Sequence, residues 1–136
     1  MIDLKAIEKI AHDFALKLVY LFGSKAKEIN TPVSDIDIAI FIDNYEHQDL
    51  RQIFLDLIFE FSQLFKSDKI DLLILNEAPI TIQFKVISEG KPLFQVNPEY
   101  RADYEENVVK LYLDFKKFED DYYETMHKRI LGAASK

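Results

Sequence analysis

The sequence predicts an α/β (α+β) fold, in which a small mixed sheet is flanked by helices and followed by a long C-terminal helix. Short apolar runs of strand length alternate with segments whose apolar residues recur every three or four positions. The chain has 136 residues, 49% hydrophobic and 13% aromatic, with only 3 Gly and 4 Pro, as in a packed globular protein. A chain of this size buries roughly two thirds of its unfolded surface, so we expect residues 1–136 to form a single domain.

The first half of the chain predicts two helices and two strands. Asp3 is a suitable N-cap for a first amphipathic helix, which we expect to end near Leu16. The apolar run 18–22 is typical of a buried strand, and Gly23-Ser24 ends it. A loop marked by Asn, Thr and Pro separates this strand from a second one. The expected elements are, in order, helix 4–16, strand 18–22, strand 35–42 and helix 46–65.

The second half predicts two strands and two helices. Pro79 stands near the start of one short helix and Gly90 just past its end, where each residue is favoured. A short run, 93–96, is expected to add an edge strand. The expected elements are strand 70–75, helix 79–89, strand 93–96 and helix 98–131.

The last helix is too long for the domain. About 34 helical residues at 1.5 Å each span ~50 Å, whereas a compact chain of this length is roughly 37 Å across. The segment 98–131 is therefore expected to kink, to divide into a helix pair, or to overhang. Its apolar seam either packs on the domain's own sheet or, in its distal half, docks on a partner. The seam comprises Tyr104, Val108, Leu111, Phe115, Phe118 and Tyr122.

Composition excludes several classes of function. The chain has no Cys, which excludes disulfides, thiol nucleophiles and Cys-ligated metals. Its net charge is −7 and its acidic residues are scattered, which argues against a nucleic-acid polymer as a direct substrate. No apolar run approaches the ~20 residues needed to span a membrane, and the N-terminus lacks a signal-like pattern. We expect a soluble cytoplasmic protein.

Two carboxylates on one strand are the main candidate site. The alternation of a strand puts Asp35 and Asp37 on one face and the intervening isoleucines on the other. Neighbouring carboxylates repel each other, so a cation between them is the natural resolution. Mg²⁺ fits, because it takes one or two carboxylates and completes its shell with water and substrate phosphate oxygens. The alternative is that these aspartates only mark the start of the strand.

Asp71 is a third candidate, as the only charged residue in strand 70–75. If this strand neighbours the one carrying Asp35 and Asp37, three carboxylates could hold two metal ions for displacement at phosphorus. Asp71 would then also accept the proton of the attacking hydroxyl. The alternative for Asp71 is an ordinary exposed carboxylate on an edge strand.

The turn that precedes these aspartates is a candidate phosphate site. Gly23 allows close approach of a phosphate, and the Ser24 hydroxyl can donate to phosphate oxygens. Ser24 could equally cap a helix. Lys25 and Lys27 could balance charge on pyrophosphate, or be ordinary surface lysines.

Together, Gly23-Ser24, Asp35-x-Asp37 and the later Asp71 resemble the signature of the DNA polymerase β-type nucleotidyltransferase superfamily. Within it the chain is similar to minimal nucleotidyltransferases (MNT), and more narrowly to MntA-type antitoxins of HEPN–MNT (HepT–MntA) toxin–antitoxin modules. The resemblance implies the nucleotidyltransferase fold and Mg²⁺-dependent transfer of AMP from ATP to a tyrosine hydroxyl of a HEPN (HepT-type) ribonuclease toxin. It also implies a hetero-oligomeric complex with that toxin.

The turn departs from the family pattern. Members usually carry Gly-Ser-Arg-x-Arg-Gly. This chain has Lys25 and Lys27 where those members have arginine, and Glu28 where they have the last glycine. Lysine keeps the charge but loses the two-pronged hydrogen bonding of arginine. The three aspartates remain, so we expect an active enzyme. Two alternatives are a non-catalytic antitoxin that neutralises by binding, and a nucleotidyltransferase acting on small molecules of the aminoglycoside type.

Overall fold

The computed structural model describes residues 2–23 and 35–134 and confirms the α/β class, with a mixed four-stranded sheet and helices around it. The elements are α1 (Leu4–Asp13), β1 (Leu16–Phe22), β2 (Ile36–Ile42), the 3-10 helix η1 (Tyr45–His47), α3 (Leu50–Phe65), β3 (Ile70–Ile74), the 3-10 helix η2 (Leu75–Glu77), α4 (Ile80–Glu89), β4 (Lys91–Gln95) and α5 (Pro98–Ala134).

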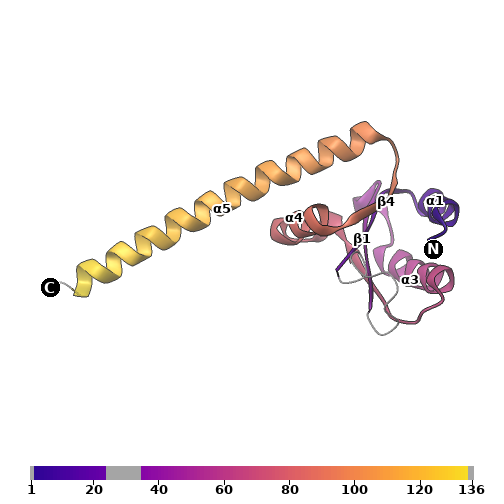
Figure 1. Cartoon of the computed structure of the whole chain (residues 1–136), viewed down its shortest axis with the longest axis horizontal. Coiled ribbons are helices and arrows are strands. Elements are labelled where there is room, and N and C mark those ends of the chain that lie inside the picture. The colour runs from indigo at the N-terminus through magenta and orange to yellow at the C-terminus, as the bar shows by residue number, and fades with distance from the viewer. Residues whose placement is uncertain (1, 24–34, 135–136) are drawn as a thin grey trace.

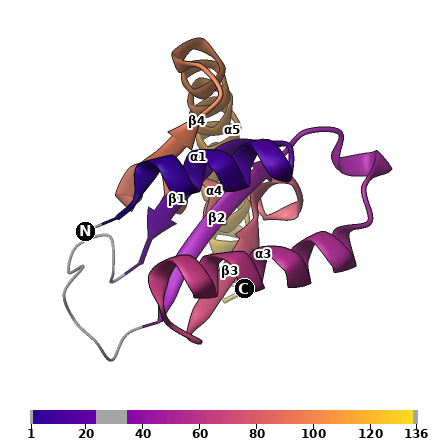
Figure 2. The same cartoon turned by 90° about the vertical axis from the view of Figure 1, so that its right-hand side faces the viewer.

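The sheet has the order β3-β2-β1-β4 and separates two layers of helices. β2 pairs with β3 in parallel, while β1 pairs antiparallel with both β2 and β4. α1 and α3 cover one face, and α4 with the first part of α5 covers the other (Figures 1 and 2). The crossover through α3 makes β2 and β3 parallel, as a helical connection between neighbouring strands normally does.

The larger core lies between the sheet and the α1/α3 layer. Because side chains alternate along a strand, the even-numbered isoleucines of β2 all enter this core. Leu57 and Phe61 of α3 are fully buried against them, and Ile7 of α1 is fully buried in the same core. This packing fixes which face of β2 is left for its odd-numbered residues.

Aromatic and polar contacts fix the first part of α5 on the other face. The hydroxyl of Tyr20 on β1, a residue only 1% exposed, donates to Glu105 of α5 at 2.9 Å. The hydroxyl of Tyr104 donates to Gln83 of α4 at 2.8 Å. Burial and the neighbouring Glu105 raise the pKa of both tyrosines, so both hydroxyls keep their protons and act as donors.

Several boundaries differ from the sequence prediction: β1 begins at Leu16 instead of residue 18, β2 begins at Ile36 and so leaves out Asp35, and β4 spans Lys91–Gln95 instead of 93–96. Two further differences concern helices. The first helix ends at Asp13 instead of near Leu16, and Ala15 adopts a left-handed φ of 57° that turns the chain into β1. The expected helix 46–65 is divided, because Asp49 caps a new helix by accepting from the Gln52 backbone N–H. The prediction of Asp3 as the first N-cap is confirmed by its bonds to Lys5 and Ala6.

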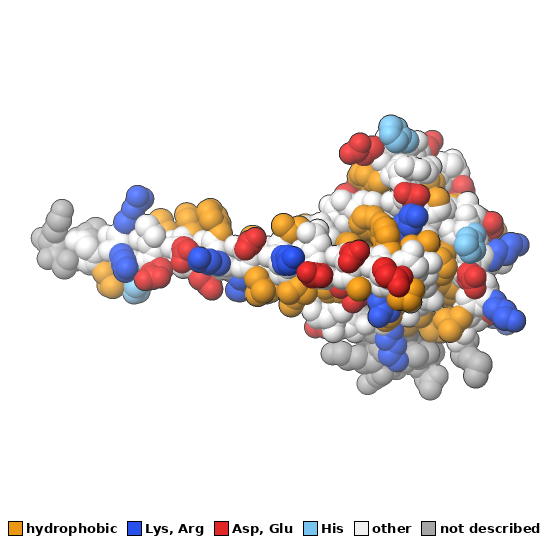
Figure 3. All heavy atoms as spheres, turned by 90° about the horizontal axis from the view of Figure 1, so that it is seen from above, with side chains coloured by type: hydrophobic (Ala, Val, Ile, Leu, Met, Phe, Trp, Pro, Cys, Tyr) orange, Lys and Arg blue, Asp and Glu red, His pale blue; other side chains and the backbone are white. Residues whose placement is uncertain are grey.

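α5 is one continuous helix of 37 residues, about 55 Å long, and it overhangs the domain (Figure 1). Its seam packs on the domain only at the start: Val108 is 1% exposed, but Leu111 is 49% and Phe118 72% exposed. Figure 3 shows the remainder projecting into solvent with apolar side chains between charged ones. The interpretation that the whole seam packs on the domain's own sheet is therefore wrong. None of the described helices, α5 included, is long and apolar enough to cross a membrane.

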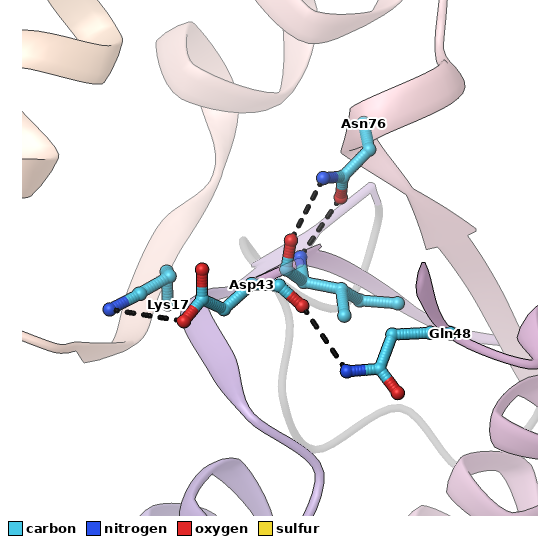
Figure 4. A network of polar contacts seen from close by, with 5 residues as sticks. Lys17, Asp43, Gln48 and Asn76 are labelled. Atoms are coloured by element: carbon cyan, nitrogen blue, oxygen red, sulfur yellow. Dashed lines mark hydrogen bonds and ion pairs between the residues drawn. The ribbon is translucent and has the colours of Figure 1, made fainter. Parts of the chain in front are cut away.

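A polar network fixes the carboxyl end of β2 (Figure 4). The Asn76 side chain accepts from the Ile42 backbone N–H at 2.9 Å and donates to the Ile42 carbonyl at 3.0 Å. Next to it, Lys17 lies 3.6 Å from Asp43, whose carbonyl accepts weakly from Gln48. β2 is thus held in place at the end opposite to Asp35 and Asp37.

We predict that Tyr20→Phe lowers the free energy of unfolding by about 1 to 2 kcal/mol, because the half-buried Glu105 carboxylate loses its donor. Arg101 lies 3.7 Å from the same oxygen and compensates only in part. Urea denaturation followed by circular dichroism measures the change. Tyr123→Phe, at a position 63% exposed, is the matched control, and an equal loss in both variants would contradict the assignment.

Candidate active site

The parallel register of β2 and β3 brings two of the predicted aspartates together. Asp37 is the direct partner of Asp71, one position beyond the pair Ile36 and Ile70. Directly paired residues project from the same side of a sheet, and for Asp37 this is the side of Ala39, which packs in the α4/α5 layer. β3 is an edge strand and Asp71 is exposed, but its carboxyl interacts with that of Asp37.

Gly23 completes this end of the sheet. It follows β1, whose last residue, Phe22, pairs with Asp37, and it has a left-handed φ of 73°. A Cβ at this position would overlap the Asp37 carboxylate, so only glycine leaves the room observed here. Ser24, Lys25, Lys27 and Glu28 lie outside the described residues, and their roles stay predictions.

The charges at the site are unbalanced. Partial burial raises the pKa of Asp37, and repulsion by Asp71, a hydrogen bond with Asp71 and repulsion by Asp35 add to the effect. Lys85 of α4 acts in the opposite direction. A carboxyl in such surroundings gains stability from a proton or from a cation. The carboxyl cluster therefore favours a positively charged ligand.

The donor set suits a hard divalent cation. Within residues 2–23 and 35–134, no group of three or more His, Asp or Glu side chains is arranged to hold a metal ion by itself. Mg²⁺ does not require such a group, since it binds through one or two carboxylates and takes its other ligands from water and substrate phosphates. Asp37 and Asp71, with Asp35 adjacent, fit that requirement.

Lys85 is a charged residue near the candidate site that the sequence prediction missed. It is the only cation in α4, and its charge favours the ionised form of Asp37. An isolated lysine on a short amphipathic helix carries no functional signal by itself. Its proximity to the aspartates follows from the fold, which places α4 on the same face of the sheet.

Comparison with protein families places this geometry in a known group. Residues 5–99 match the family described as Polymerase beta, Nucleotidyltransferase. The chain belongs to this nucleotidyltransferase family. The matched residues contain β1 to β4 and all of the candidate site residues, and they end at the start of α5.

Solved structures show the same fold for this nucleotidyltransferase. A toxin–antitoxin with AMP-PNP is 22% identical, with a TM-score of 0.73, over 92% of this chain and 98% of that one. A tri-AMPylated Shewanella oneidensis HEPN toxin in complex with MNT antitoxin is 22% identical, with a TM-score of 0.67, over 90% of this chain and 94% of that one. The toxin–antitoxin MntA–HepT is 22% identical, with a TM-score of 0.65, over 90% of this chain and 95% of that one. No curated protein matches the chain.

We predict that Asp71→Asn stabilises the nucleotidyltransferase in the absence of metal, raising its melting temperature at pH 7 by about 2 °C. The raised pKa of Asp37 means that the folded protein binds this proton more tightly than the unfolded chain does, so stability falls as pH rises above the ordinary value of 3.8. Removing Asp71 weakens that penalty. Thermal denaturation in EDTA measures the difference in melting temperature between Asp71→Asn and the wild type.

The exposed Asp68→Asn is the control, and its melting temperature should not change. Added Mg²⁺ should stabilise the wild type and the control more than Asp71→Asn. A lower melting temperature for Asp71→Asn in EDTA would show that repulsion at this pair is not significant.

We also predict that Gly23→Ala costs about 1 to 2 kcal/mol of stability and weakens nucleotide binding at least tenfold. The added methyl group would displace the Asp37 carboxylate, and alanine is strained at a positive φ. Urea denaturation and calorimetric titration with ATP measure the two effects. Gly132→Ala, where a Cβ meets no atom within 4 Å, should neither destabilise the protein nor weaken ATP binding, and unaltered ATP affinity in Gly23→Ala would exclude this role.

Proposed function

We propose that this chain is an Mg²⁺-dependent protein adenylyltransferase that acts as an antitoxin. It transfers AMP from ATP to a tyrosine hydroxyl of a HEPN-type ribonuclease toxin and releases pyrophosphate. The observation that carries the proposal is the in-register pair of Asp37 and Asp71 beside the Gly23 turn, in a chain of the nucleotidyltransferase family. Solved toxin–antitoxin structures of the same fold, one with AMP-PNP and one with a tri-AMPylated toxin, support the partner and the reaction.

Each part of the site has a role in this reaction. Gly23 leaves room for the Asp37 carboxylate beside the turn, and Ser24, Lys25 and Lys27 follow it in the chain as proposed phosphate contacts. Asp35, Asp37 and Asp71 would hold Mg²⁺, which would neutralise the phosphates and acidify the attacking hydroxyl. Lys85 limits the excess negative charge around Asp37.

The bond changes are those of a single displacement at phosphorus. The tyrosine oxygen forms a bond to the α-phosphorus of ATP, and the bond from that phosphorus to the bridging oxygen of pyrophosphate breaks. Asp71, exposed at the edge of the sheet, accepts the proton of the hydroxyl. The exposed edge position leaves room for a protein acceptor to approach.

We predict that incubation with labelled ATP, Mg²⁺ and the toxin encoded by the neighbouring gene labels the toxin. The double variant Asp35→Asn, Asp37→Asn should lose at least 1,000-fold in rate, because the metal and phosphate ligands are removed. The control Asp68→Asn should label the toxin at the wild-type rate. Labelling by the double variant at an undiminished rate would exclude this mechanism.

A non-catalytic antitoxin is the second candidate, and the overhang of α5 favours it. A long exposed helix could occlude a toxin without any chemistry. In that case the double aspartate variant would still neutralise the toxin in cells, although it transfers no AMP. Loss of neutralisation together with loss of labelling supports the enzyme.

A further inference from the structure

The part of α5 that extends beyond the domain carries a continuous apolar face. Residues at steps of three and four lie on one side of a helix, so these side chains form one stripe. Phe118 is 72% exposed, Tyr122 53% and Ile130 62%. We call this surface the distal stripe; it consists of Leu111, Phe115, Phe118, Tyr122, Met126 and Ile130.

The distal stripe continues a face that is already an interface. Along the first turns of α5, the same side of the helix buries Val108, hydrogen-bonds Tyr104 to α4 and stacks Tyr112 on Phe84 of α4 at 3.8 Å. Farther along its length, α5 extends past the rest of the domain, and the same helix face continues (Figure 1). An exposed row of large apolar side chains on a soluble protein usually marks an interaction surface.

α5 is helical along its whole projecting length in the single chain. Ion pairs brace it, with Lys116 3.5 Å from Glu119 and Lys128 3.2 Å from Glu124. Each such pair contributes only a few tenths of a kcal/mol, so the pairs support the helix without accounting for its apolar side. A partner would dock on a helix that needs little further ordering, which lowers the entropic cost of binding.

Charges along the distal half argue against a second copy of the chain as the occupant. The signs run basic, acidic, basic, in a nearly symmetrical order around Tyr122. In a two-fold pair that overlaps the whole stripe, parallel in register or antiparallel about this residue, like charges would face like charges and destabilise the pair. The charged residues that border the stripe are Lys116, then Glu119 and Asp121, then Arg129, whereas Lys117, Asp120 and Glu124 lie on the opposite side of the helix.

We propose that the distal stripe docks a helix of a different protein, whose contact face is apolar, with basic residues at its centre and acidic residues at both ends. The proposal rests on the proposed function, since this occupant is the acceptor of AMP. α5 leaves the domain from the layer that covers the aspartate-bearing face of the sheet. A partner held along α5 is therefore on the same side of the sheet as Asp37 and Asp71.

The test measures binding of the neighbouring-gene toxin to the full chain by calorimetry, without ATP. The double variant Phe118→Glu, Tyr122→Glu should weaken the complex at least 100-fold, as expected for two central aromatic contacts. Leu113→Glu, at a position 59% exposed on the opposite side of α5, is the matched control and should bind within about threefold of the wild type. All three positions are exposed, so circular dichroism should show the same helix content in every variant.

A second arm tests the charge pattern. Glu119→Lys with Asp121→Lys should weaken the complex about tenfold at low ionic strength, and the difference should shrink as salt is added. Unchanged affinity of the stripe variant overturns the proposal, as does absence of any complex with the wild type. Dissociation of a wild-type homodimer by the stripe substitutions also overturns it, because a second copy would then be the occupant.

The outcomes separate this inference from the proposed function. If the stripe variant binds and adenylylates the toxin normally, the function stands and the docking surface is wrong. If the stripe variant fails to bind, while the wild type binds the toxin but transfers no AMP, the docking surface stands and the catalytic function is wrong.

Discussion

The structure depends on the parallel pairing of β2 with β3, which sets one carboxylate directly beside another. Such a pair opposes folding, since the pKa of Asp37 is raised by burial and by Asp71. It persists because the other face of β2 is fully packed and Asn76 fixes the far end of the strand with two hydrogen bonds. A one-residue slip would exchange the isoleucines for the aspartates in the core.

The same constraint explains the arrangement of the α4/α5 layer. Its contacts gather around Tyr20, Val86 and Tyr104, while Asp35 and Asp71 are left exposed at the start of their strands. A helix packed over them would bury unpaired charge, which is costly. Lys85 is exposed on α4, and its charge still favours the ionised form of Asp37. The open end is thus a consequence of the charges as much as a requirement of substrate access.

Much of the fold was predictable from the sequence, because helices and strands each repeat their apolar residues with a characteristic period. The caps at Asp3 and Gly90 marked helix ends correctly, whereas the shared face of Asp35 and Asp37 stays a prediction, because β2 begins only at Ile36. Adjacency of Asp71 stayed conditional, because register is a tertiary property that no local pattern encodes. The early end of α1 was missed because Ala15 adopts a left-handed conformation that alanine rarely takes. The effect of Lys85 on Asp37 could not be predicted from the sequence, because it depends on the packing of α4 against the sheet.

The seam of α5 shows the limit of periodicity most clearly. Apolar residues at steps of three and four indicate which side of a helix is apolar, but they do not indicate what covers that side. Val108 and Phe118 belong to the same seam, and one is 1% exposed while the other is 72% exposed. What separates them is distance along a rigid rod: at 1.5 Å per residue, ten residues carry the helix about 15 Å onward, beyond the edge of α4. The first part of α5 therefore completes the core, and the rest needs a partner to bury the same face.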